Sequence, residues 1–109
     1  MAKYLLIESR DPFDSADVQN LYELADGLAG HADELTVYLV QNGVLPTRRS
    51  STAAPQLAAL ARKANVLADD FSLRERGIPE ADLAAGVQAA GIDDLVELVA
   101  ENGRKVLWH

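Results

Sequence analysis

Five short runs of apolar residues are spaced along the chain, and each has the length of a strand. Residues 4–7 and 35–40 are continuous runs of aliphatic, aromatic and β-branched residues, and 65–69 holds three apolar residues between polar ends. Runs of this kind are typical of strands covered on both faces, as in a parallel sheet. Weaker runs over 86–89 and 105–108 predict a small fourth strand and a closing strand.

Between these runs, apolar residues recur at three- and four-residue spacing, which predicts helices packed on the sheet. The first helix precedes residue 30 and has Asp14 or Ser15 as its cap, and the second follows a cap at Ser51 or Thr52. A short helix over 80–84 and a last helix over 93–101 complete the pattern. The last helix carries Ile92, Leu95, Val96 and Val99 on one side.

Strands that alternate with helices indicate an α/β protein. A chain of 109 residues has the size of one domain. We therefore predict a single three-layer domain over residues 1–109, with a mostly parallel sheet of about five strands flanked by helices.

Charge and composition exclude several classes of function. Ten Lys and Arg stand against 17 Asp and Glu, and the net charge of −7 disfavours nucleic acids and anionic membranes and favours basic partners. No apolar stretch approaches the roughly 20 residues of a membrane helix, and Met1 leads directly into strand-like sequence rather than a signal peptide. We expect a cytoplasmic protein. Because the chain has no cysteine, disulfides, thiolate catalysis, persulfides and Cys-ligated zinc are excluded.

The segment over residues 65–77 is where we expect a site. Its strand ends in two carboxylates, and residues 72–75 fit a capping box in which the Ser72 hydroxyl accepts a bond from the backbone N–H of Glu75. In open α/β sheets, ligands bind beyond the carboxyl ends of the strands, where helix N-termini present N–H groups to anions. The candidate ligand-binding residues of this crevice are Asp69, Asp70, Ser72, Arg74, Arg48, Arg49 and Asn42.

Simpler interpretations of the same residues remain open. The two aspartates can be no more than caps of a turn, and the arginines no more than solvated loop charges. Alternatively, Asp69 and Asp70 hold Mg²⁺ for chemistry on a phosphorylated ligand. That alternative is weakened because Lys105 starts its strand rather than ending it. His31 and His109 have no companion ligands in the sequence, so we assign them no catalytic or metal role.

Aromatic residues are expected in the core or at a subunit interface. These are Tyr4, Tyr22, Tyr38 and Trp108. The closing strand at Trp108 can pair with another subunit.

Several segments, taken in order and spacing, match a known pattern: V-Y-L-V-Q-N-G-V at 37–44, the apolar strand ending at Asp69, L-R-E-R-G-I at 73–78 and K-V-L-W-H at 105–109. In these the chain resembles the DsrE/DsrF/DsrH-like sulfur-relay family, which includes the TusBCD subunits and YchN-like proteins. The resemblance implies a DsrE-like fold of flavodoxin-like topology that assembles into dimers, trimers or hexamers.

Sulfur carriers of that family hold a cysteine at the end of the third strand, seven residues before the Arg of an Arg-Gly pair. Counting back from Arg76 reaches Asp69. A carboxylate cannot accept and pass on sulfane sulfur, so the resemblance implies no carrier activity. We predict a non-catalytic homo-oligomer without a cofactor, acting as a partner or scaffold for sulfur-relay subunits or as a small-anion-binding module. The enzyme alternative that uses Asp69 and Asp70 with the arginine loop stays open.

Overall fold

A computed structural model describes residues 2–109, so Met1 lies outside the described residues. It holds one five-stranded sheet in the order β4-β3-β2-β1-β5, in which all neighbouring strands run parallel. The prediction of about five mostly parallel strands is confirmed. The strands are β1 (Lys3–Glu8), β2 (Glu34–Leu39), β3 (Asn65–Asp69), β4 (Gln88–Ala90) and β5 (Arg104–Trp108).

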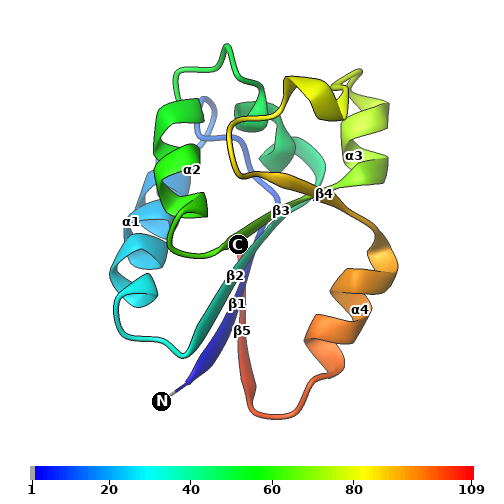
Figure 1. Cartoon of the computed structure of the whole chain (residues 1–109). Helices are drawn as coiled ribbons and strands as arrows, with labels where there is room; N and C mark the ends of the chain where they lie inside the picture. The colour runs from blue at the N-terminus through cyan, green and yellow to red at the C-terminus, as the bar shows by residue number, and fades with distance from the viewer. Residues whose placement is uncertain (1) are drawn as a thin grey trace.

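Helices cover both faces of this sheet (Figure 1). The helices α1 (Asp17–Ala29) and α2 (Ala54–Ala61) lie on one face, and α4 (Ile92–Ala100) lies on the other. The short helix α3 (Asp70–Glu75) and the 3₁₀ segments η1 (Gln41–Thr47) and η2 (Glu80–Asp82) gather beyond the carboxyl ends of the strands. The predicted three-layer arrangement is therefore confirmed.

The two faces bury unequal cores. Under α1 and α2, the larger core joins side chains such as Leu6, Val37 and Val66 to Leu21 and Leu57, because continuous apolar strands leave no polar face to solvent. Under α4, a smaller core is built from Leu5, Ile7, Tyr38, Val40, Ala90 and Leu95.

The strand order differs in one respect from the flavodoxin order, in which β1 lies between β2 and β3. Here β1 lies between β2 and β5, because the chain returns from β4 through α4 to the far side of β1. Strands β2, β3 and β4 are therefore added on one side of β1, and β5 is added on its other side. The two edges of the sheet are β4 and β5.

The predicted side-chain caps of the first two helices are wrong. The cap residues of α1 and α2 are Ala16 and Ala53, and neither makes a side-chain capping bond. Ser51 instead accepts a bond from the N–H of Ala53 and donates one to the carbonyl of Pro46, so its hydroxyl organises the loop before the helix. The predicted helix over 80–84 is only the 3₁₀ turn η2.

The helix α4 does not bury all four predicted apolar residues. Leu95 is buried and Leu98 packs beside it, whereas Ile92, Val96 and Val99 are exposed. At about 100° per residue, these three side chains share a stripe to one side of the sheet-facing leucines. No helix within residues 2–109 is long and apolar enough to cross a membrane.

Candidate functional site

Asp69 is the last residue of β3. It is only 8% exposed, and its carboxylate contacts groups of the protein. Its Oδ2 accepts hydrogen bonds from the backbone N–H of Ser72 at 2.9 Å and from the Ser72 hydroxyl at 2.7 Å. Asp69 has extended backbone dihedrals and the helix starts at the next residue, which makes it the N-cap of α3. The carboxylate therefore satisfies the helix N-terminus from within.

Tyr38 of β2 completes this arrangement from the neighbouring strand. Its hydroxyl donates to the carbonyl of Gly91 at 2.8 Å and lies 3.3 Å from Oδ1 of Asp69. Burial, and then the nearby charge of Asp69, raise the pKa of the Tyr38 hydroxyl well above its ordinary value of 10.0. Tyr38 thus ties the ends of β2 and β3 to the start of α4.

The predicted capping box between Ser72 and Glu75 is not formed. Because α3 begins at Asp70, Ser72 already lies in its first turn and cannot be the residue that precedes the helix. Its hydroxyl turns back to Asp69 and accepts a bond from the backbone N–H of Gln41 at 2.8 Å. Ser72 therefore links η1 to the end of β3 and does not form the predicted helix N-terminus with N–H groups available to an anion.

Asn42 reaches the same region through Arg76. The Asn42 side-chain oxygen accepts bonds from Nε and Nη2 of Arg76 at 3.2 and 3.0 Å, and Nη1 of Arg76 donates to the Ser72 carbonyl. Arg76 thus ties its turn to the Ser72 carbonyl and to the Asn42 side chain. Nearby, Gly43 lies so close to β1 that an added Cβ would stand 2.3 Å from the Glu8 carbonyl oxygen.

The remaining candidates lie at the periphery or elsewhere. Asp70 and Arg74 face solvent and form an i,i+4 pair at 3.8 Å. Arg48 donates to the Leu45 carbonyl, and Arg49 contacts Asp82 of η2 through its backbone and, at 3.9 Å, its guanidinium. The structure therefore joins Asp69, Ser72 and Asn42 in one network, whereas the contacts of the loop arginines are with other segments.

This geometry limits what Asp69 can do. Oδ2 already accepts two bonds from Ser72, and Oδ1 faces the Tyr38 hydroxyl 3.3 Å away, so a ligand or metal ion would have to compete with these groups for a largely buried carboxylate. Within the described part of the chain, no three histidine, aspartate or glutamate side chains are grouped so that they could hold a metal ion. The network at the end of β3 has the bonding pattern of a structural joint.

Sequence reasoning missed a second polar pair at the carboxyl ends of the strands. Glu8 is fully buried, and its Oε1 lies 2.7 Å from Nδ1 of His109, while Oε2 accepts a bond from the backbone N–H of Arg10. The His109 backbone is also held, by the Ile7 carbonyl and the Ser9 hydroxyl. The two residues are 101 positions apart, and local patterns cannot pair them.

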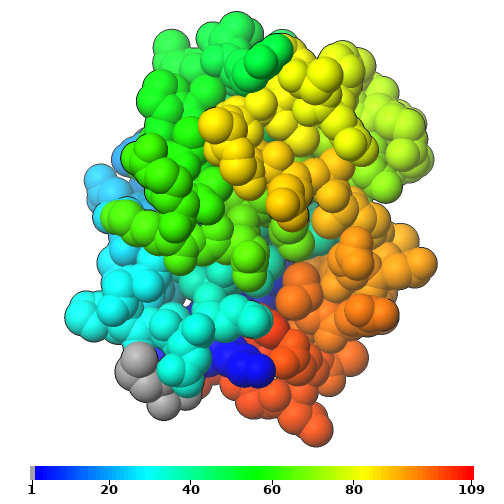
Figure 2. All heavy atoms as spheres, in the orientation of Figure 1, coloured from blue at the N-terminus to red at the C-terminus, as the bar shows by residue number. Residues whose placement is uncertain are grey.

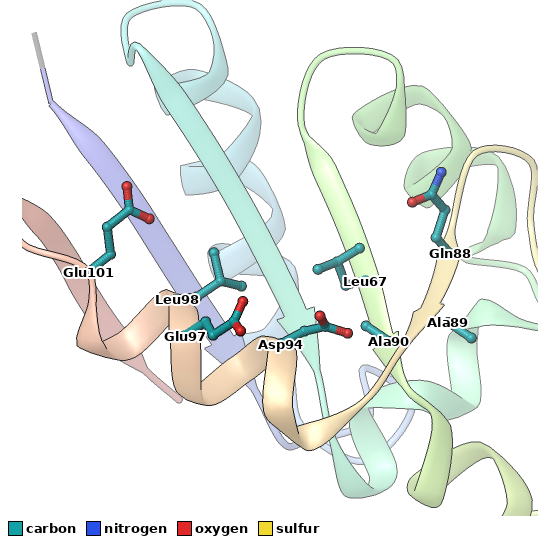
Figure 3. A pocket seen from close by; sticks show the side chains of 8 residues that line it. All are labelled: Leu67, Gln88, Ala89, Ala90, Asp94, Glu97, Leu98 and Glu101. Atoms are coloured by element: carbon teal, nitrogen blue, oxygen red, sulfur yellow. The ribbon is translucent and has the colours of Figure 1, made fainter.

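A cavity of about 380 Å³ opens on the α4 side of the sheet, beside the short edge strand β4 (Figure 3). Its floor includes Leu67 and Leu98, and three acidic side chains line it: Asp94 and Glu97 of α4, and Glu101, which directly follows α4. We call this the acidic groove. It has the character of a surface for cationic groups with an apolar component.

Comparison with known proteins gives three findings. Residues 10–105 match the family model described as DsrH like protein. Over 100% of both chains, the fold superposes on the ychN protein from E. coli with a TM-score of 0.86 and 21% identity. It also superposes on the protein of unknown function MTH1491 from Methanobacterium thermoautotrophicum, again over 100% of both chains, with a TM-score of 0.79 and 20% identity. No curated protein matches the chain in sequence.

Proposed function

Because this chain belongs to the DsrH-like family, we propose that it is a cytoplasmic, non-catalytic subunit of a sulfur-relay system, which binds relay partners and carries no sulfur itself. One observation supports this most directly. The chain has no cysteine. The resemblance puts the carrier thiol at the position of Asp69, and the Asp69 side chain caps the helix α3.

The chemistry of the side chains supports a binding role. Persulfide transfer needs a thiolate that attacks, holds and releases sulfane sulfur. The carboxylate of Asp69 offers no such atom, and its bonds to Ser72 and Tyr38 keep it in the protein interior. The chain therefore keeps the fold of the family without the carrier thiol, and we assign its function to a binding surface.

The acidic groove is the proposed contact surface for a relay partner. Asp94 and Glu97 project from one side of α4 over an apolar floor, whereas Glu101, which follows the helix, is already paired with Lys3 and Arg104. A partner segment that carries Lys or Arg beside apolar residues would match both features. The adjacent strand β4 is only three residues long, so side chains rather than backbone pairing would give this contact its specificity.

The direct experiment mixes this chain with a cysteine-bearing DsrE-like carrier from the same organism. We expect a stable complex in sedimentation, weakened by Asp94→Lys and Glu97→Lys. Lys63→Glu, which reverses a charge on a different surface, is the matched control and should leave binding unchanged. Absence of a complex with any cysteine-bearing relay protein would refute the partner role.

A second role, in which the chain binds a small anion, is favoured by one observation. The guanidinium groups of Arg74 and Arg49 are exposed, and their nearest carboxylates lie 3.8 and 3.9 Å away. Both groups can therefore donate hydrogen bonds to a bound phosphate or carboxylate. Phosphate titration of the wild type and of Arg74→Gln by calorimetry tests this, since binding that survives the substitution would place the anion elsewhere. The Mg²⁺-dependent enzyme alternative has less support, because Asp69 is largely buried and its Oδ2 is already bonded twice to Ser72.

Self-association is the last part of the proposal. The described chain leaves several large apolar side chains exposed on α4 and β5, which a single copy of this size has no means to cover. Sedimentation at micromolar concentration should therefore give a mass above that of one 11.7 kDa chain.

A further inference from the structure

We propose that two copies of this chain pair through the edge strand β5, antiparallel and about a two-fold axis that passes between the two Val106 residues. The inference rests on the self-association proposed above and names the surface that forms it. It is carried by four features of β5: its open edge, its apolar surroundings, its two anchors and its self-complementary charges.

The edge of β5 is open and long enough to pair. The strand bonds only to β1, so the backbone groups on its other side have no partner strand. His109 donates its backbone N–H to Ile7 of β1, and alternation along a strand then points the N–H and C=O of Val106 outward. Around a two-fold at Val106, the pairs 106–106 and 104–108 together give about six backbone hydrogen bonds.

Apolar side chains surround this edge on both faces of the sheet. Val106 and Trp108 lie on the α4 face of the sheet. The exposed stripe of α4 lies on the side of the helix that is opposite the acidic groove and faces β5; it consists of Ile92, Val96 and Val99. Leu107 and Leu24 of α1 lie on the other face. Their exposed fractions run from 44% to 65%, and α4 and β5 adjoin along one side of the molecule (Figure 2).

Both ends of β5 are fixed before any partner binds. At its start, the guanidinium of Arg104 is buried and bonded to Glu34 and Glu101. Beyond its end, His109 is held by Glu8, Ile7 and Ser9. An edge strand that is already ordered loses little conformational entropy on pairing, which favours association. The opposite edge, β4, has three residues and no comparable exposed apolar side chains.

Charge along β5 favours a second copy over an unrelated strand. Two cavities of about 220 and 280 Å³ share Leu24 and Leu107 and form one groove between α1 and β5. Lys105 lines one end of this groove and Asp17 lines the other. A two-fold at Val106 places Lys105 of each copy opposite Leu107 of the other, beside the end that holds Asp17. Two reciprocal lysine–aspartate pairs result, as an isologous interface requires.

The absence of native cysteine allows a decisive test. In an antiparallel hydrogen-bonded pair the Cα atoms lie about 5.5 Å apart, within the range of a disulfide. We expect Val106→Cys to give a covalent dimer under mild oxidation. Gln88→Cys, an exposed position on the other edge strand, is the control and should remain non-covalent.

Charge reversal supplies an independent test. Asp17→Lys and Lys105→Asp should each weaken the dimer by about tenfold, and the double variant should restore it. Dissociation is followed by sedimentation and by the emission of Trp108, the single tryptophan, which should shift to the red on dilution of the wild type. Circular dichroism verifies that each variant is folded.

The outcomes separate this interface from the wider proposal. A wild-type oligomer in which Val106→Cys fails to cross-link, or in which the double charge variant is no better than the single ones, overturns pairing through β5 while self-association stands. A wild-type monomer at micromolar concentration removes both. Neither result touches the relay-partner role, which is tested by complex formation with a carrier.

Discussion

Replacing Asp69 with alanine tests whether this residue is a structural joint. The substitution removes the N-cap of α3, worth about 1 kcal/mol, and leaves the hydroxyl of Ser72 without its charged acceptor, worth roughly a further 1–3 kcal/mol for a buried group. Tyr38 keeps its bond to the Gly91 carbonyl, so its loss is smaller. The free energy of unfolding should fall by about 2–4 kcal/mol in total.

The assay is urea denaturation followed by circular dichroism, supported by a thermal melt. A loss of that size lowers the melting temperature of a domain this large by roughly 8–16 °C. Asp69→Asn keeps one acceptor oxygen for Ser72 and should lose less than the alanine variant. Asp70→Ala is the matched control, because Asp70 is half-buried and its ion pair with Arg74 is long, and it should lose less than about 1 kcal/mol.

A particular pattern of results would refute this reasoning. If Asp69→Ala were as stable as the wild type but had lost a measured ligand, Asp69 would be a binding group and its bonds to Ser72 incidental. Equal losses for Asp69→Ala and Asp70→Ala would likewise mean that the cap contributes nothing beyond a helix-terminal charge.

Three further outcomes follow from the structure. Burial raises the pKa of Tyr22 and Tyr38 above the ordinary 10.0, so their stabilising effect is complete below pH 10 and is lost as pH rises; absorbance at 295 nm should show them ionising only as the chain unfolds. Hydrogen bonds from Arg104 lower the pKa of Glu101 below 4.5, so this pairing stabilises above pH 4.5 and fades as pH falls; Arg104→Met should therefore destabilise more at pH 7 than at pH 3 in denaturant titrations. Gly43→Ala forces a methyl group against a carbonyl of β1 and should cost about 1–3 kcal/mol in the same assay; a neutral result would contradict the close approach.

The strands could be predicted from the sequence because their signal is local. Residues 65–69, for example, form β3 with the predicted bounds, since a run of three apolar residues between polar ones is too short for a buried helix and has the length of a strand. The helix caps could not be predicted in the same way. Whether Asp69 or Ser72 caps α3 depends on where the strand ends, and helix and strand share that boundary without an intervening loop.

The structure joins some of the candidate site residues and separates others. Asp69 and Ser72 are near neighbours in sequence and are joined, whereas the loop arginines depend on the course of η1 and η2, which no local pattern specifies. The same limit applies to α4. Its periodicity shows which side chains share a stripe, but only the sheet beneath it decides that Leu95 is buried while Val96 is exposed. Pairs distant in sequence, such as Glu8 with His109, lie beyond local reasoning altogether.

The most direct test of the account follows the sulfur itself. A cysteine-bearing DsrE-like carrier is loaded with ³⁵S-sulfane sulfur and mixed with this chain, and the two are separated under denaturing, non-reducing conditions. We expect all label to stay on the carrier or to pass to an acceptor, while this chain remains unlabelled and is bound to the carrier before denaturation. Stable label on this chain would contradict the account.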